Sequence, residues 1–162
     1  MRIDRSTTFF FDASVLVAGA YSPGSGSALV LRTCIVAGFR AQITSAVIME
    51  CARTLEDFAP ASMDRFHNLL TDIDWMLLSV PAEETLKGYE RCVHPKDAHV
   101  LAAAVEGGAE FLLTLDRRHL LAACPAVEEA ELPIIILTPG DFIQRYYPLH
   151  AEFPDLPAPR RA

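Results

Sequence analysis

Four acidic residues stand where their carboxylates can reach a common point in a folded α/β domain. Asp12 and Asp116 each follow a short apolar run, and Asp97 and Glu50 lie near the starts of amphipathic segments. In an open parallel sheet, polar side chains just beyond the strand ends meet at one edge. Clustered carboxylates suit Mg²⁺ or Mn²⁺, and such an ion activates water for phosphodiester hydrolysis. The four acids are therefore the candidate catalytic and metal-binding residues, for one or two ions.

Helix capping is the competing explanation for these acids. Asp is a preferred residue at the start of a helix, where the helix dipole also favours a negative charge. Taken singly, Asp12, Asp97 and Asp116 fit that role, and Glu50 fits an ordinary solvated position. Capping gives no reason for acids of separate elements to gather at one edge of a sheet. Their joint arrangement therefore favours a metal site.

The elements that must position these residues alternate short apolar runs with longer amphipathic ones, which is typical of βαβ units. Strands are predicted at 8–11, 41–43, 76–80, 111–115 and 134–137. Helices are predicted at 27–37, 46–56, 62–73, 83–91, 97–106, 117–122 and 141–147. We expect an α/β fold, a three-layer α/β/α sandwich with a central, mainly parallel five-stranded sheet.

Size and composition indicate one folded domain. The chain has 162 residues, 51% of them hydrophobic and 22% charged, which suits a globular protein with a single core. Its net charge of −7 argues against nucleic-acid binding through a broad basic surface, although bound cations can mask a carboxylate cluster. We predict a domain at 1–147 and a mobile, proline-rich tail at 148–162.

Cysteine usage and hydropathy favour a cytoplasmic protein without membrane association. Cys34, Cys51, Cys92 and Cys124 are scattered, without the spacing of a zinc site, and are expected to be reduced thiols. The first twenty residues superficially resemble a signal peptide, but Asp12 interrupts their apolar stretch. No run approaches the ~20 apolar residues of a membrane span.

Four motifs resemble those of the PIN-domain family of metal-dependent nucleases, which includes the toxins of VapBC-type toxin–antitoxin pairs. The motifs are FFDAS at 10–14, ITSAVIME at 43–50, PKDAHVLAAA at 95–104 and LTLD at 113–116, and the likeness extends from about 8 to 147. The resemblance carries over to Asp12, Glu50, Asp97 and Asp116 as the four family acids, in that order. It also implies Ser14 and Thr114 as hydroxyl residues that support the carboxylates.

The resemblance implies an endoribonuclease that uses Mg²⁺ or Mn²⁺, forms a homodimer and is silenced by an antitoxin. Asp12 and Asp97 would be the principal metal ligands, and Asp116 and Glu50 would complete the site directly or through water. The chain departs from the family in having Ala13-Ser14 where Thr-Asn is more frequent, and in lacking a further acid soon after Asp116. The second departure leaves the number of ions open.

Basic residues near the acids have two explanations. Arg117, Arg118 and His119 follow the last acid, and they suit either substrate phosphates or a solvated helical turn. His94 and Lys96 precede Asp97, and the sequence does not decide their role. His99 lies two residues after Asp97, about 200° around a helix, so we do not expect it to act as a general base.

Two other functional classes are a phospho-acceptor or phosphatase domain and a non-catalytic binding module. A phospho-acceptor or phosphatase domain also places an Asp after its first strand, but a phosphatase has a second Asp where this chain has Ser14. A non-catalytic RNA- or protein-binding PIN module would be favoured by loss of an acid, and none is lost.

Several apolar residues are candidates for either a dimer interface or the core: Leu29, Val30, Leu31, Val47 and Ile48.

Overall fold

A five-stranded sheet with every neighbouring pair parallel forms the centre of the computed structural model, which describes residues 1–153 and 155–156. The strand order is β3-β2-β1-β4-β5. The strands are β1 (Thr8–Phe11), β2 (Arg40–Thr44), β3 (Trp75–Leu78), β4 (Phe111–Leu113) and β5 (Ile135–Leu137). The predicted fold class and strand number are therefore confirmed.

The central strands are apolar on both faces because helices cover both sides of the sheet. Phe9, Phe10 and Phe11 of β1 are fully buried. The ring of Phe9 stacks on that of Phe111 in β4, with centroids 5.3 Å apart, and meets Phe142 edge-on at 4.8 Å. This aromatic packing joins the neighbouring strands β1 and β4 to one helical layer.

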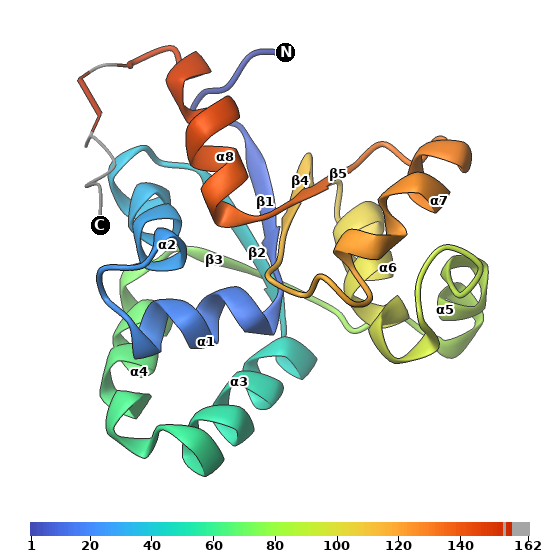
Figure 1. The fold of residues 1–162 in the computed structure, drawn as a ribbon, viewed down its shortest axis with the longest axis horizontal. Helices are drawn as coiled ribbons and strands as arrows, with labels where there is room; N and C mark the ends of the chain where they lie inside the picture. Colours follow the sequence, from blue (N-terminus) through green and yellow to red (C-terminus); the bar gives the residue numbers. More distant parts are fainter. Residues whose placement is uncertain (154, 157–162) are drawn as a thin grey trace.

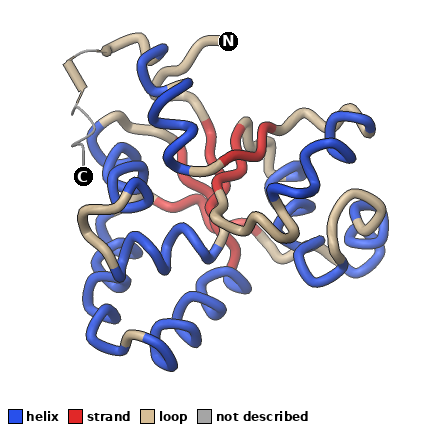
Figure 2. The backbone as a smooth tube through the Cα atoms, viewed as in Figure 1, coloured by secondary structure: helices blue, strands red, loops and turns tan. Residues whose placement is uncertain are grey.

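Helices lie on either side of the sheet and complete the three-layer sandwich (Figure 1). The strands form the middle layer (Figure 2). One side holds α1 (Ala13–Tyr21), α2 (Gly26–Val36), α3 (Ser45–Phe58), α4 (Met63–Asp72) and α8 (Pro139–Arg145). The other side holds α5 (Glu83–Tyr89), α6 (Ala98–Glu106) and α7 (Cys124–Glu129). Short 3-10 helices connect them at η1 (Pro60–Ser62), η2 (Pro95–Asp97), η3 (Leu121–Ala123) and η4 (Tyr147–Leu149).

The predicted helix at 117–122 is wrong. Residues 117–120 form a turn, which leads into η3 and then α7. Oδ1 of Asp116 accepts hydrogen bonds from the backbone N–H groups of Arg118 and His119, at 3.0 and 3.1 Å. Such a side-chain bond competes with helix propagation. The helix begins later, with Pro125 in its first turn, a position that suits proline.

The described part of the predicted tail packs against the start of the chain. His150 forms a parallel bridge with Ile3, and its side chain is buried. Glu152 accepts two hydrogen bonds from Arg5, at 2.8 and 2.7 Å. Residues 154 and 157–162, on which the rest of that prediction falls, lie outside the described residues. Residues 148–153 are therefore anchored on the domain.

Two predictions concern membrane-spanning segments and a dimer interface. None of the helices formed by residues 1–153 and 155–156 is long and apolar enough to span a membrane alone; α1 and α2 pass that test only as a pair, bent by 99°. Of the apolar residues considered for a dimer interface, Val30, Leu31 and Val47 are fully buried in the monomer. Leu29 and Ile48 are half-buried. The homodimer stays a prediction.

Candidate metal centre

All four predicted acids line one cavity, of about 520 Å³. Asp12 directly follows β1. Asp116 lies shortly after the end of β4, the strand next to β1 in the sheet. Glu50 projects from α3, which follows β2, and Asp97 ends η2 and precedes α6. The carboxyl ends of three neighbouring strands thus bring residues 104 positions apart in sequence to one place.

Asp12 is held by two hydroxyl groups from different elements. Ser14 Oγ and Thr114 Oγ1 both donate to its Oδ2, at 2.6 and 2.8 Å. The backbone pairing of β1 with β4 continues as far as this residue, because Asp12 N–H donates to the carbonyl of Leu113 at 3.0 Å. The contacts predicted for Ser14 and Thr114 are therefore present, and they fix the orientation of the carboxylate.

The same hydroxyls position the segment that carries Asp116. Thr114 Oγ1 accepts the backbone N–H of Asp116, and Ser14 Oγ accepts that of Leu115, both at 3.0 Å. Each hydroxyl therefore donates to Asp12 while it accepts from the chain leading to Asp116. This short network couples the first and the last acid of the cluster.

Helix capping does not explain two of the acids. Asp12 stands at the N-cap of α1 and Asp97 at the N-cap of α6, but neither side chain makes a capping hydrogen bond. Asp116 does bind backbone N–H groups, through Oδ1. The carboxylates of Asp12 and Asp97 are thus directed to the cavity and not to their own helices.

The cluster is electrostatically unfavourable without a cation. Burial raises the pKa of Asp12, whose residue is 7% exposed, and the charge of Asp97 raises it further, while bonds from Ser14 and Thr114 act in the opposite direction. The pKa of Glu50 is also raised, first by desolvation and then by the charge of Asp12. Binding of a divalent ion would relieve this repulsion.

His119 faces the acids rather than solvent. Its Nδ1 lies 2.8 Å from Oδ2 of Asp97 and 3.8 Å from Oδ2 of Asp116. The shorter contact is not aligned as a hydrogen bond, so Oδ2 of Asp97 is buried without an aligned donor. This oxygen is available to a metal ion. The turn that Asp116 stabilises brings His119 to this position. The position was not expected from the helix predicted at 117–122.

A second possible metal group consists of His94, Asp97 and His119, whose ligand atoms lie within 4.8 Å of one another. Two observations count against joint ligation by the histidines. Their rings stack at 4.5 Å with an angle of 15°, so one ion cannot lie in both ring planes. Nδ1 of His94 accepts the N–H of Lys96 at 3.2 Å, which leaves the ring proton on Nε2. The carboxylate cavity is the better metal site.

His99 is not among the residues that line the cavity. Its Nδ1 is buried without a hydrogen-bond partner among the described residues, and its charge lowers the pKa of Glu50 against the larger effect of desolvation. Its ring is thus near Glu50 without lining the cavity, and the expectation that it is no general base stays a prediction.

Sequence reasoning missed an aromatic pair at the same cavity. Tyr21 and Phe58 line it and are 53% and 64% exposed. Their rings lie 5.2 Å apart with an angle of 48°. Each residue ends a helix, α1 and α3. Because α1 was not predicted, the sequence offered no way to bring Tyr21 beside Phe58.

Comparison with known proteins identifies the family. A family model described as PIN domain matches residues 8–118. The chain belongs to the PIN-domain family. PIN domains are generally nucleases and typically use divalent metals. No match was found among curated proteins.

A solved structure shares the fold of this PIN domain. It is the crystal structure of VapBC2 from Rickettsia felis bound to a DNA fragment from their promoter, which aligns with a TM-score of 0.54 and 11% sequence identity. The match covers 82% of this chain and 98% of the other. At this identity the likeness shows the fold alone.

Proposed function

We propose that this PIN domain is a Mg²⁺- or Mn²⁺-dependent endoribonuclease that hydrolyses RNA phosphodiester bonds, and that it is the toxin of a toxin–antitoxin pair. The observation that carries the proposal is the convergence of four acids from separate elements on one cavity. Two of those acids occupy helix starts without capping them. Family membership supports the nuclease chemistry.

Asp12 and Asp97 are assigned as the principal ligands of one or two ions. Both are largely withdrawn from solvent, and Oδ2 of Asp97 has no aligned donor. Asp116 and Glu50 complete the site directly or through water. A hard divalent ion fits this all-carboxylate set, since Mg²⁺ and Mn²⁺ prefer oxygen ligands.

The bound ion supplies an activated water and charge stabilisation at the scissile phosphate. Ser14 and Thr114 hold Asp12 in one rotamer through their bonds to Oδ2, and such support raises metal affinity. Glu50 lines the cavity, and partial desolvation of its carboxylate together with the charge of Asp12 raises its pKa. It is therefore placed to orient the attacking water. Nδ1 of His119 lies 2.8 Å from Oδ2 of Asp97, at the side of the cavity.

The alternatives fit the geometry less well. A phospho-acceptor needs an accessible nucleophilic carboxylate, whereas Asp12 is 7% exposed and two hydroxyls occupy its Oδ2. A phosphatase needs a second acid two residues on, and Ser14 stands there. A non-catalytic PIN module would not need four acids around one cavity.

An antitoxin, a second copy of the chain and a reducing compartment complete the proposal. The fold shared with a chain of VapBC2 supports an antitoxin partner. All four cysteines are free, as expected for a cytoplasmic protein. Sedimentation at micromolar concentration tests the homodimer, and a monomer alone would remove that part of the proposal.

The nuclease proposal is tested with purified protein and a labelled RNA that has single-stranded and hairpin regions. Cleavage should require Mg²⁺ or Mn²⁺, stop with EDTA and vanish in Asp12→Asn. Ser45→Ala is a suitable control because Ser45 is exposed at the start of α3 and is not among the residues lining the cavity. Equal cleavage by wild type in EDTA, or by Asp12→Asn in Mg²⁺, would refute the assignment.

A further inference from the structure

A second cavity adjoins the metal centre and has the opposite charge. It has a volume of about 380 Å³, and the acidic, basic and histidine side chains that line it are Glu90, Arg91, His94, Arg118 and His119. We call it the basic cavity. His119 lines the basic cavity, and its Nδ1 lies 2.8 Å from Oδ2 of Asp97. Asp97 lines the cavity that holds the four acids. The two cavities therefore meet at one contact.

The two arginines of the basic cavity are unpaired. Within residues 1–153 and 155–156, neither guanidinium has an ion pair or a hydrogen bond. Both side chains are exposed. Glu90 is the one carboxylate among the described residues that line the cavity. Two unpaired cations in one hollow of a protein with net charge −7 indicate a site for an anion.

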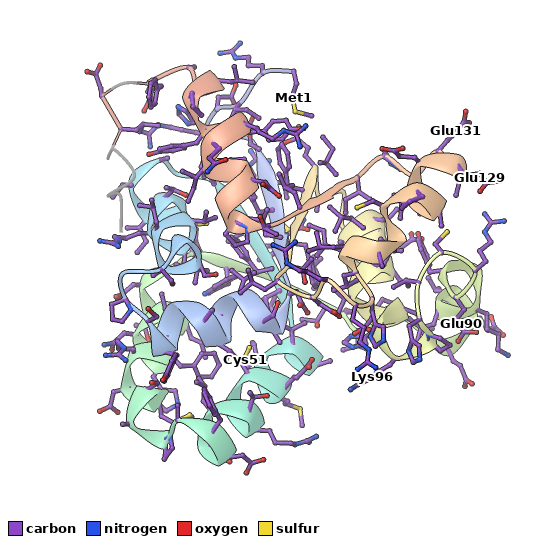
Figure 3. The ribbon with its side chains drawn as sticks, viewed as in Figure 1. Met1, Cys51, Glu90, Lys96, Glu129 and Glu131 are labelled. Carbon is purple, nitrogen blue, oxygen red and sulfur yellow. The ribbon has the colours of Figure 1, made fainter. Side chains whose placement is uncertain are left out.

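His94 adds a neutral donor to the same hollow. Its Nδ1 accepts the backbone N–H of Lys96, so its ring proton lies on Nε2. Stacking on His119 at 4.5 Å holds the ring in place. Figure 3 shows Lys96 and Glu90 on the side of the molecule that holds α5 and α6, away from Cys51 near α1. The basic cavity thus extends from the acids toward the α5 side.

We infer that the basic cavity binds a backbone phosphate of the RNA next to the phosphate that is hydrolysed. This inference rests on the proposed nuclease function. Arg91 and Arg118 supply the charge, and His94 supplies an N–H donor. Guanidinium groups suit phosphate because their donors match its oxygens. A strand that crosses the Asp97–His119 contact would place neighbouring phosphates in the two cavities.

The test measures RNA binding separately from cleavage. A fluorescein-labelled single-stranded oligoribonucleotide is titrated with the full-length Asp12→Asn protein, and anisotropy gives Kd at several salt concentrations. Arg91→Gln and Arg118→Gln are made in this background. Arg40→Gln is the matched control, since Arg40 is exposed at the start of β2, at the end of the strand opposite to the four acids, and its side chain has no partner among the described residues. A parallel titration uses inorganic phosphate alone.

Each cavity variant should weaken RNA binding about tenfold, as expected for loss of a charged hydrogen bond. The slope of log K against log salt should also fall by about 0.7, the value for one contact to a single strand. In the wild-type background the same substitutions should raise KM for the RNA. Arg40→Gln should change neither quantity.

Three results would overturn the inference. Equal affinity and slope in the cavity variants and the control would show that the arginines do not contact RNA. Tight binding of inorganic phosphate, lost in Arg118→Gln while RNA binding is unchanged, would assign the cavity to a free anion. Retained RNA binding together with lost binding of a protein partner would assign it to a protein. Failure of the nuclease proposal is distinct, since it would appear as RNA binding without cleavage by wild type.

Discussion

The side-chain amide of Gln42 donates a 2.7 Å hydrogen bond to the backbone carbonyl of Gly107. The bond joins β2 to the end of α6, the helix that Asp97 precedes. A Cβ atom at Gly107 would clash with Leu78 Cδ1 and would lie 2.8 Å from the carbonyl oxygen of Ala103 and 3.0 Å from Gln42 Oε1. This glycine is therefore required by close packing rather than by backbone conformation.

Gly107→Ala should lower the free energy of unfolding by about 1 to 3 kcal/mol, the usual cost of overpacking. The neighbouring Gly108→Ala is a matched comparison. Gly108 has φ of +71° and open space around its Cβ position. Gly108→Ala should therefore lower the free energy of unfolding through conformational strain alone, by about 1 kcal/mol. Urea unfolding measures both. Equal stability of Gly107→Ala and wild type would contradict the packing argument.

Thr114→Val should weaken metal binding. Valine keeps the shape of threonine but removes the donor to Asp12 and the acceptor for the N–H of Asp116. Loss of such support typically costs roughly 10- to 100-fold in metal affinity or activity. Calorimetric Mg²⁺ titration and RNA cleavage should both show the loss. Thr114→Ser retains the hydroxyl and should behave as wild type, so an equal loss in both variants would show that the methyl group matters instead.

Asp97→Asn tests whether Asp97 is a metal ligand or only a helix cap. It should abolish cleavage while leaving the metal-free protein as stable as wild type or more so, because one repelling charge is removed. Mg²⁺ should raise the Tm of wild type much more than that of the variant. Asparagine is a good N-cap, so helix formation is not at risk. Retained cleavage and an equal Mg²⁺ response would overturn the assignment of Asp97.

His119→Asn tests whether the histidine positions Asp97. An asparagine amide nitrogen can take the place of Nδ1 beside Oδ2 of Asp97, 2.8 Å away in the wild type. His119→Phe fills the space without a nitrogen atom beside Oδ2 of Asp97. The Asn variant should retain Mg²⁺ affinity, and the Phe variant should lose about tenfold. If both variants bind Mg²⁺ alike, the contact has no positioning role.

The contribution of Asp12 and Glu50 to the stability of the metal-free protein should fall as pH rises from about 4, the ordinary range of carboxyl pKa values. The pKa values of Asp12 and Glu50 are raised in the folded state, chiefly by desolvation. The folded protein therefore holds these protons more strongly than the unfolded chain, and stability present at low pH is lost as pH passes the raised values. Mg²⁺ should cancel the decline. A pH-independent Tm difference with and without Mg²⁺ would contradict this linkage.

Much of the fold and the acid cluster could be predicted because strand ends leave strong local signals. The run at Phe9–Phe11 reads as a buried strand, and Asp12 directly after it marks the functional edge of the sheet. The same reasoning placed Asp116 beyond β4. Helix α1 escaped prediction because it is buried on several sides, including Val15, Leu16 and Ala20, and therefore lacks a clear apolar stripe.

Contacts across elements could not be predicted from local pattern. The position of His119 beside Asp97 depends on a turn that one oxygen of Asp116 stabilises, and helix propensity does not report such a bond. The Tyr21–Phe58 pair depends on how α1 packs against α3. The unpaired state of Arg91 and Arg118 is likewise a property of the folded surface.

The central position of β1 affects when the site can exist during synthesis. β1 is made first among the strands, yet one of its neighbours is β4, and Thr114 must reach back to Asp12. A nascent chain that has not yet released residues 114 to 116 from the ribosome lacks the fourth acid and one of the two hydroxyls that orient the first. On the proposed function, the polypeptide is inert as a nuclease until residue 116 has left the ribosome, and the messenger RNA being read is spared until then.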